Sequence, residues 1–282
     1  MKTNSKKGIL FIVPTPIGNM SDITLRAIDT LKEVAIIGAE DTRTSGKLLK
    51  YHGIDTKMLS YHKFNEMKRV DLFVEKLLKG DDIAIISDAG TPGISDPASK
   101  IIAGAIANNI EVITLPGAVA FVPALVSSGL SCEQFHFIGF LPDKSNLKDM
   151  ILNKIKNIEN TLIFYESPHR LFKTIAILKK ILGNRKISIA REISKLYETH
   201  YRTTFDEVLK KPEDIILKGE FVLIVDGFQP EKVTSEDIIN EMKKYIGQGY
   251  SGKETVHKVK ELFSIPKNRV YKLMLEIDDV DG

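Results

Sequence analysis

The stretch SDAGTPGISDP, residues 87–97, follows directly on DIAIISD, an apolar run typical of a buried strand. Gly90 and Gly93 permit a positive φ and let a ligand approach the main chain. Pro92 stiffens the chain and removes one N–H donor. Such a loop suits a ligand bound by main-chain hydrogen bonds, for example a nucleoside or an amino-acid moiety. The alternative is a structural tight turn.

The sequence around this loop alternates between apolar runs and segments of helical period. Strands are expected at 8–13, 34–38, 83–87 and 110–115, and helices at 22–33, 66–79 and 96–108. Ser21 or Asp22 is placed to cap the first helix, and Asp96, followed by Pro97, is placed to start the third. This β-then-α order predicts an α/β fold with a mostly parallel sheet and helices on both faces.

A second set of elements follows the first. Strands are expected at 135–140, 161–167, 186–192 and 219–227, and helices at 145–157 and 169–182. We therefore expect two α/β domains, residues 1–120 and 121–229, with a ligand cleft between them. A small helical unit, residues 230–282, completes the chain.

The last unit carries two apolar stripes of helical spacing separated by SIPKN, residues 264–268. The stripes are Val256, Val259 and Phe263, and Val270, Leu273, Met274 and Ile277. Residues 243–272 hold eight lysines and arginines against two glutamates, a net charge of +6. This pattern resembles a helix-turn-helix that contacts nucleic acid. A helical hairpin with a solvated lysine face explains it equally well.

The totals exclude several classes of protein. The 282 residues carry a net charge of only +3, so any nucleic-acid surface must be local. One cysteine excludes an internal disulfide, which fits a reducing compartment. The first apolar run ends at Pro14, and the stretch 112–126 is broken by glycine and proline. Neither a signal peptide nor a membrane span is therefore expected, and we expect a cytoplasmic protein.

Motifs of the common nucleotide-binding folds and hydrolases are absent. The turn VPTPIGN, residues 13–19, lacks the G-x-G-x-x-G string that dinucleotide enzymes place after their first strand. No G-x-x-x-x-G-K-[ST] and no G-x-S-x-G occur in the chain. The six histidines show no metal-binding spacing, so no metal is expected.

Four polar motifs lie at or just beyond the carboxyl ends of expected strands, where open α/β sheets bind ligands. They are AEDTRTSG at 39–46, SYHKFNE at 60–66, YESPHR at 165–170 and AREISK at 190–195. Each one alone fits an ion pair or a helix cap equally well. Together with the glycine loop they favour a shared cleft.

Taken in order, the motifs resemble the tetrapyrrole-methylase fold family over about residues 8–227. The segments that carry the resemblance are VPTPIGNMSDITLRAIDTL, AEDTR, SDAGTPGISDP, LPGAVA, GFLP, TLIFYESPHRL, AREISK and GEFVLIV. Within the family they are most similar to members that methylate ribosomal RNA. The last unit is also similar to the small basic appendage of those members.

This resemblance implies S-adenosylmethionine as methyl donor, a homodimer, and 2′-O-methylation of a cytidine in the decoding region of 16S rRNA, within the small ribosomal subunit. It implies donor contacts at Pro14, Ser87, Asp88, Ala89, Gly90, Ile94, Val119, Ala120, Tyr165, Glu166, Ile193 and Val222. The LPG motif departs from many members, because Ala118-Val119-Ala120 stands where they have a small hydroxyl residue or proline. One side-chain hydrogen bond to the donor is therefore not expected here.

A ribose hydroxyl is a weak acid, so a base or a group that stabilises the developing alkoxide should assist methyl transfer. Catalytic candidates are Glu40, Asp41, His62 and Glu166, among which the sequence does not choose. Positioning with proton loss to water is the alternative. Substrate contacts are expected at Asn19, Asp22, Arg43, Asn65, His169, Arg170, Lys267, Arg269 and Lys272.

Two other functions fit parts of the sequence. A methyltransferase acting on a carbon of a tetrapyrrole would share the fold and the donor. A ribosome assembly factor that binds RNA without turnover would share the basic tail. RNA binding requires cationic side chains that contact phosphates, so the basic tail favours an RNA substrate over a tetrapyrrole.

Overall fold

The computed structural model describes residues 6–230, 234–263 and 265–278 of the chain. The chain divides into two compact units, and the boundary lies between Phe228 and Gln229. The first unit contains two five-stranded sheets, and the second is helical. Each unit is described separately.

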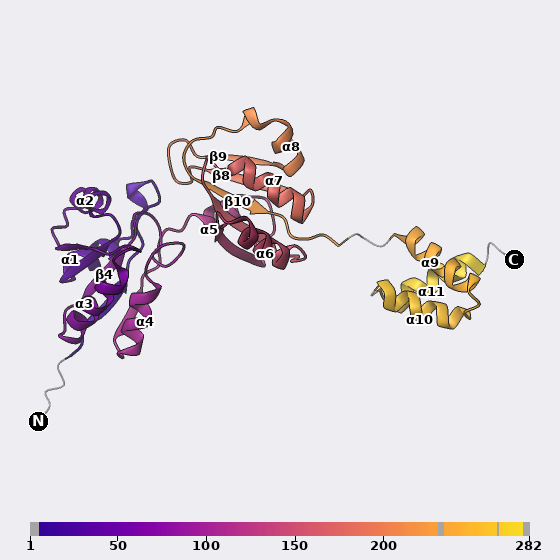
Figure 1. Ribbon diagram of the computed structural model, residues 1–282, viewed down its shortest axis with the longest axis horizontal. Helices are drawn as coiled ribbons and strands as arrows, with labels where there is room; N and C mark the ends of the chain where they lie inside the picture. The colour runs from indigo at the N-terminus through magenta and orange to yellow at the C-terminus, as the bar shows by residue number, and fades with distance from the viewer. Residues whose placement is uncertain (1–5, 231–233, 264, 279–282) are drawn as a thin grey trace, which may run out of the picture. The chain divides into compact units, whose positions relative to one another are not determined.

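The first sheet is entirely parallel, as expected, with strand order β3-β2-β4-β1-β5. Its strands are β1 (Ile9–Ile12), β2 (Ile36–Ala39), β3 (Met58–Ser60), β4 (Ile83–Ile86) and β5 (Glu111–Thr114). Its helices are α1 (Leu25–Glu33), α2 (Thr42–Tyr51), α3 (Glu66–Leu78) and α4 (Ser99–Ala107), with a short 3-10 helix η1 (Met20–Asp22) (Figure 1).

Successive side chains of β4 point to opposite faces of this sheet, and each face is covered by helices. Ile83 and Ile85 join a buried cluster with Phe73 of α3. Ala84 and Ile86 join another with side chains of α1 and α2. The continuous apolar runs in the sequence follow from this burial on both faces.

Four details differ from the sequence-based expectations. The three-residue strand β3 and helix α2 were not predicted, because neither carries a long apolar pattern. Thr24 caps α1, not Ser21 or Asp22, and its side chain accepts a hydrogen bond from the Ala27 N–H. Helix α4 begins at Ser99 without a side-chain cap, so the capping role expected of Asp96 was wrong.

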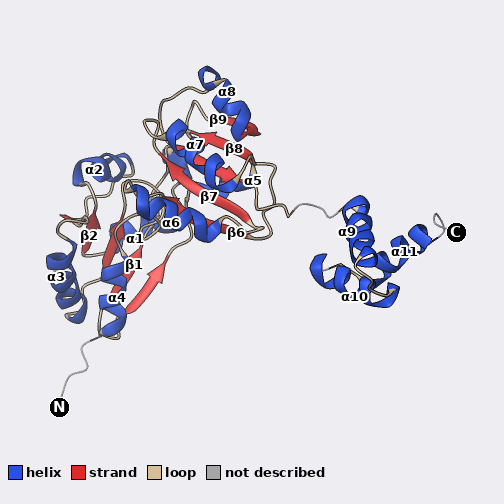
Figure 2. Cartoon of the chain, turned by 45° about the vertical axis from the view of Figure 1, so that its right-hand side comes forward, coloured by secondary structure: helices blue, strands red, loops and turns tan. Residues whose placement is uncertain are grey.

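The second sheet has the order β6-β7-β10-β8-β9 and is mixed (Figure 2). Its strands are β6 (Phe135–Phe140), β7 (Thr161–Glu166), β8 (Lys186–Arg191), β9 (Thr199–Thr204) and β10 (Phe221–Val225). Only β6 and β7 pair in parallel. Its helices are α5 (Phe121–Val126), α6 (Ser145–Ile155), α7 (Leu171–Leu182) and α8 (Phe205–Lys210), with η2 at Pro212–Asp214.

The side chains of β10 also point alternately to opposite faces of the second sheet, and both faces are buried. Leu223 and Val225 of β10 face a cluster that includes α7, whereas Val222 and Ile224 face one that includes α5. The edge strand β9 was not predicted, because its sequence THYRTT is polar. The boundary expected between residues 120 and 121 falls between the two sheets, inside one compact unit.

The second unit contains α9 (Ser235–Gly247), α10 (Gly252–Phe263) and α11 (Lys267–Asp278). Helix α9 was not predicted, and it begins with a capping box between Thr234 and Asp237. Its Ile238 and Met242 pack against the two apolar stripes expected from the sequence, and the buried core also includes Val256, Val259, Ile265, Val270, Leu273 and Met274. The side chain of Ile277 lies outside the described residues. Three helices therefore share one core in place of a hairpin.

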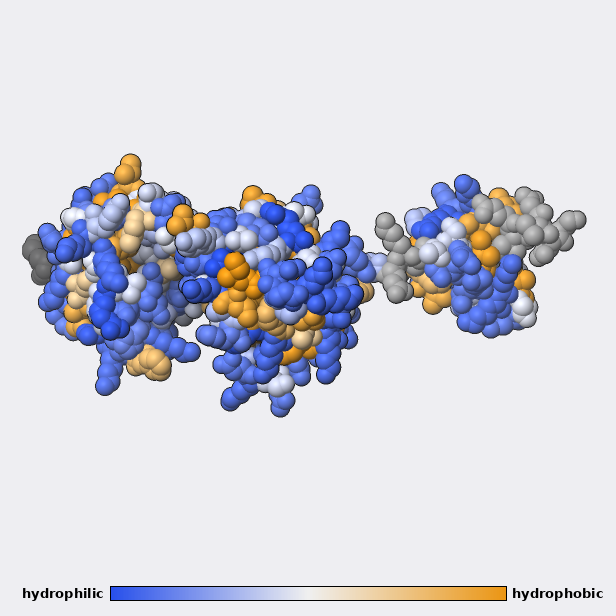
Figure 3. All heavy atoms as spheres, turned by 90° about the horizontal axis from the view of Figure 1, so that it is seen from above, coloured by the Kyte–Doolittle hydropathy of each residue, from blue (hydrophilic) through white to orange (hydrophobic). Residues whose placement is uncertain are grey.

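None of the described helices is both long enough and apolar enough to cross a membrane. The face of the molecule in Figure 3 is mostly hydrophilic, with small hydrophobic patches.

Candidate functional site

A cleft of about 460 Å³ lies between the ends of the two sheets of the first unit. The first sheet contributes Ile17, Glu40 and the loop after β4, and the second contributes residues after β7 and β8 and before β10. Val119 and Ala120, in the segment that joins the sheets, line it too. Ligands of open α/β sheets gather at the carboxyl ends of the strands, and this cleft lies there.

The glycine loop forms one wall of the cleft. Gly90 exchanges two main-chain hydrogen bonds with Thr15, of 2.9 and 3.0 Å, which tie the loop to the turn after β1. The Thr91 hydroxyl donates to the Ala118 carbonyl at 2.9 Å and ties the middle of the loop to the segment that joins the two sheets. Gly90 has a φ of +82°, and a Cβ there would meet ordinary contact distances. The backbone conformation therefore requires glycine at this position.

All but two of the residues expected to contact the donor line this cleft. They are Asp88, Ala89, Gly90, Ile94, Val119, Ala120, Tyr165, Glu166, Ile193 and Val222. Ser87 lines a smaller adjoining pocket. Pro14 is not among the lining residues, because its ring is buried against Gly117, where a Cβ would lie 2.4 Å from the proline Cβ.

Five carboxyl groups line the cleft, and three of them have a raised pKa. Burial, with a smaller contribution from Glu40, raises the pKa of Asp96 to about 6. Burial and then Asp88 raise the pKa of Glu40, and burial also raises that of Asp88. Negative charge held at partly buried positions favours a cationic ligand. The sequence did not predict that Asp96 lies in the cleft, because an Asp-Pro pair indicates the start of a helix.

Two of the four catalytic candidates have structural roles. Glu166 is 2% exposed and accepts hydrogen bonds from the Ser167 N–H at 2.7 Å and the Thr174 hydroxyl at 2.6 Å. It also pairs with Arg170 at 3.3 Å. Asp41 caps α2 and pairs with Arg43 at 3.0 Å, and hydrogen bonds from Arg43 lower the pKa of Asp41 to about 2. A carboxylate of that pKa is a weak base.

The third candidate, His62, is not among the residues that line the cleft. Its main-chain N–H donates to Asn65 Oδ1 at 2.9 Å, and its Nδ1 accepts from the Phe64 N–H at 3.2 Å. Asn65, a predicted substrate residue, donates from Nδ2 to the Ser60 carbonyl at 3.2 Å. These contacts build the turn before α3. Of the four candidates, only Glu40 and Glu166 line the cleft. The Glu166 carboxylate is already held by its three donors, so Glu40 is the candidate base that remains.

The remaining predicted substrate residues are spread over the molecule. Asn19 caps η1, and the Asp22 carboxylate accepts a hydrogen bond from the Ser194 hydroxyl. The Arg43 side chain is 89% exposed. His169 is exposed, and Arg170 pairs with Asp143 at 2.7 Å as well as with Glu166. Lys267, Arg269 and Lys272 are exposed on α11, in the second unit.

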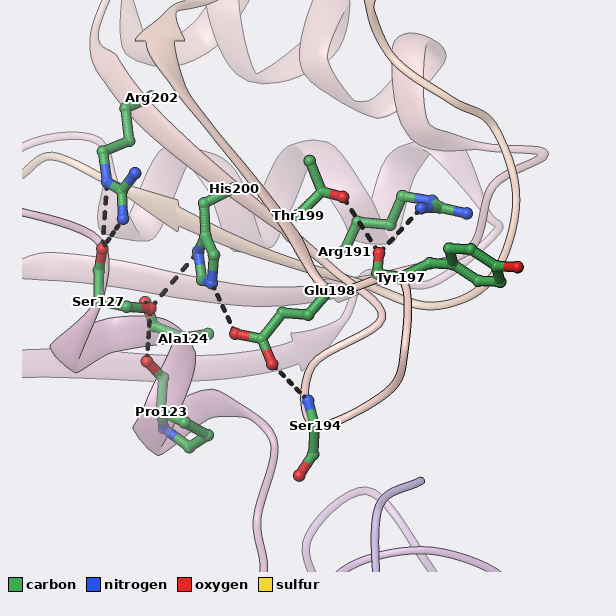
Figure 4. A network of polar contacts seen from close by, with 10 residues as sticks. All are labelled: Pro123, Ala124, Ser127, Arg191, Ser194, Tyr197, Glu198, Thr199, His200 and Arg202. Atoms are coloured by element: carbon green, nitrogen blue, oxygen red, sulfur yellow. Dashed lines mark hydrogen bonds and ion pairs between the residues drawn. The ribbon is translucent and has the colours of Figure 1, made fainter. Parts of the chain in front are cut away.

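The loop after β8 contributes Ile193 to the cleft, and a network of polar contacts connects it to neighbouring strands and helices (Figure 4). Glu192 and Ser194 have positive φ angles of 54° and 66°. Glu198 accepts from the Ser194 N–H at 2.7 Å, and Arg191 donates to the Tyr197 carbonyl at 3.1 Å. Non-glycine residues keep such angles only where their surroundings enforce them. The loop thereby fixes the position of Lys195.

Within the described residues, no three histidine, cysteine, aspartate or glutamate side chains form a group that could hold a metal ion.

Comparisons with known proteins bear on this site. The family model for the tetrapyrrole (corrin/porphyrin) methylases matches residues 10–209. A protein of Halalkalibacterium halodurans called ribosomal RNA small subunit methyltransferase I is 44% identical, with 95% of this chain and 94% of the relative covered. A protein of the same name from Synechocystis is 40% identical, with 98% of this chain and 100% of the relative covered. A crystal structure of diphthine synthase superposes with a TM-score of 0.65 at 12% identity, over 78% of this chain and 90% of that one.

Proposed function

This chain belongs to the tetrapyrrole (corrin/porphyrin) methylases, and we propose that it transfers a methyl group from S-adenosylmethionine to the ribose 2′-oxygen of a cytidine in the decoding region of 16S rRNA. One observation carries the choice of substrate. The relatives named ribosomal RNA small subunit methyltransferase I match 95–98% of the chain, which must include most of the second unit. The diphthine synthase structure covers 78%.

The cleft fits the methyl donor of this family. S-adenosylmethionine, when bound, supplies an electrophilic methyl group on a positively charged sulfonium. Glu40, Asp88 and Asp96 offer negative charge to compensate that cation. Ile94, Val119 and Val222 offer apolar surface, and the loop around Gly90 exposes main-chain groups. This combination of apolar walls and a few polar groups is typical of cofactor sites.

The protein's own residues have two tasks in the reaction. They hold the acceptor oxygen in line with the donor, which by itself can supply much of the rate enhancement. They also provide a place for the proton that the hydroxyl loses. Glu40 and Asp96 line the cleft, and burial raises the pKa of both carboxyl groups, that of Asp96 to about 6, which makes each a stronger base than an ordinary carboxylate. Tyr165 cannot act as base, because burial raises its pKa to about 12.

The second unit supplies cationic surface for RNA. Lys267 and Lys272 are exposed on α11 within the basic window of net charge +6. Contacts between such side chains and phosphates release counterions and strengthen binding to nucleic acid. The proposal includes a cytoplasmic location, where ribosomes are assembled, and a homodimer.

The test is methyl transfer from radiolabelled S-adenosylmethionine to small ribosomal subunits from cells that lack this gene. The labelled RNA is digested to nucleosides, which are then separated. Label in 2′-O-methylcytidine supports the proposal. Label in a methylated base overturns the 2′-oxygen as acceptor. If neither small subunits nor naked rRNA are labelled, RNA is not the substrate. The hypotheses to test are then a tetrapyrrole acceptor, or donor binding without turnover.

The role of the carboxyl groups is tested with Glu40→Gln and Asp96→Asn in the same assay. If either group takes the proton, its variant loses about 10²-fold or more in kcat. If both variants retain the rate of the unaltered protein, the proton passes to water and the site acts by positioning alone.

A further inference from the structure

A second pocket of about 230 Å³ adjoins the donor cleft. Its walls are the turn after β1, the first turns of α2, the start of the glycine loop, and Lys195 and Glu220 from the second sheet. Ile17, Asp88, Ala89 and Glu220 line both cavities, so the two share a wall. A molecule in the smaller pocket therefore lies against the donor cleft.

The side chain of Ser45 marks this pocket as a binding site. Ser45 lies on α2, is 2% exposed, and lines the pocket. Within the described part of the chain its Oγ has no hydrogen-bond partner. Buried hydroxyls in folded proteins almost always have one. The Oγ itself is closed off from the pocket in the free protein, and a rotation of the short serine side chain would let a polar ligand supply the missing partner.

The rest of the pocket is shaped by close packing. A Cβ at Gly18 would lie 2.3 Å from Cγ of Lys195, so glycine leaves room for the lysine stem to pack against this turn. The Lys195 ammonium is held by Glu192 at 2.8 Å and Glu220 at 2.9 Å. The Thr15 hydroxyl already donates to the Ser87 carbonyl at 3.1 Å. Ser45 is thus the wall residue with an unused buried hydroxyl.

We propose that this pocket binds the base of the target nucleotide, extruded from the RNA, and that the Ser45 hydroxyl rotates toward the base to become its hydrogen-bond partner. The inference rests on the proposed function. The pocket volume of about 230 Å³ lies below the range of about 300–1,000 Å³ typical of drug-sized ligands, which suits a single small ring. Enzymes that modify a nucleotide commonly extrude it into a pocket, and RNA loops offer unstacked bases. The shared wall then places the attached ribose beside the donor cleft.

Three variants test the proposal in the methyl-transfer assay with small subunits. Thr44→Trp, at the rim of the pocket, should fill it and lower kcat/KM by about 10²-fold, because a displaced acceptor reacts slowly. Ser45→Ala should lower kcat/KM by about 3- to 10-fold, the worth of one hydrogen bond. Tyr51→Trp is the matched control, because Tyr51 is 68% exposed on the same helix outside the pocket, and it should keep full activity.

The affinity for S-adenosylmethionine is measured by calorimetry for all three variants. It should change by less than about twofold, which also shows that each variant is folded. Full activity of both Thr44→Trp and Ser45→Ala would overturn the base pocket and leave the proposed function intact. Equal losses of donor affinity and activity would also overturn it, because the residues would then belong to the donor site. Failure of the unaltered protein to methylate RNA contradicts the proposed function instead.

Discussion

Replacing Ser45 by alanine should make the protein more stable while it lowers activity. The Ser45 hydroxyl is buried and has no partner among the described residues, and such a group costs about 1–3 kcal/mol. Alanine is also better than serine within a helix by roughly 0.5 kcal/mol. The atom removed is small, so the cavity left behind costs only a few tenths, about 0.3 kcal/mol. We expect the free energy of unfolding of the first unit to rise by about 2 kcal/mol.

Differential scanning calorimetry of the full chain measures this change, with the first unit as the larger transition. For a unit of this size the midpoint should rise by about 4–8 °C. Thr174→Val is the matched control, because Thr174 is a buried helical residue whose hydroxyl donates to Glu166 at 2.6 Å. That variant leaves a buried carboxylate short of a donor and should lose about 2 kcal/mol.

The two variants should therefore move the midpoint in opposite directions. A midpoint for Ser45→Ala that is unchanged or lower would refute the reasoning, because the hydroxyl would then have a partner in the free protein. The pocket would lose the observation that marks it as a ligand site.

The remaining predictions concern the donor loop, the acidic cleft and the second unit. Gly90→Val should weaken S-adenosylmethionine binding at least about tenfold in calorimetry, since a β-branched residue resists a φ of +82°; unchanged affinity would remove this loop from the site. Asp96 has a pKa raised to about 6 by burial, so its contribution to stability is full below about pH 4 and is lost as the pH rises to 6. Asp96→Asn should abolish that loss in urea titrations at pH 4 and 7, and parallel pH curves for both proteins would contradict the assignment. Binding of the cationic donor favours the ionised form of Asp96, so the protein should release protons when the donor binds near pH 6. Calorimetry in buffers of different ionisation enthalpy measures this release, and no release would place the cation elsewhere. Deletion of residues 231–282 should weaken association with small subunits far more than donor binding, whereas equal losses would assign the second unit a structural role.

Much of the fold could be read from local pattern. Strands β4 and β10 are continuous apolar runs that are buried at every position, because both faces of their sheets are covered. The elements that were missed are short or polar, such as β3 and β9. Pairing with a neighbouring strand stabilises these elements, and their amino-acid composition does not predict that pairing.

The candidate site was predictable only in part. The glycine loop and most of the apolar cleft residues followed from motifs whose spacing is local. The partners of charged side chains did not, because a carboxylate's role depends on what folds against it. Asp41 and Glu166 were equal to Glu40 as candidate bases, yet one caps a helix and the other is buried among three donors.

By itself the sequence determined the family, the parallel first sheet and the glycine loop for which donor binding is proposed, because each follows from short motifs of neighbouring residues. Only the tertiary structure decided that Asp96 faces the cleft and that Ser45 is buried without a partner. It also decided that Gly18 meets Lys195, far along the chain, to form a second pocket. The physical reason is that the order of the strands in the two sheets decides which loops lie next to one another. A polar group becomes buried or finds a partner only when those loops have come together.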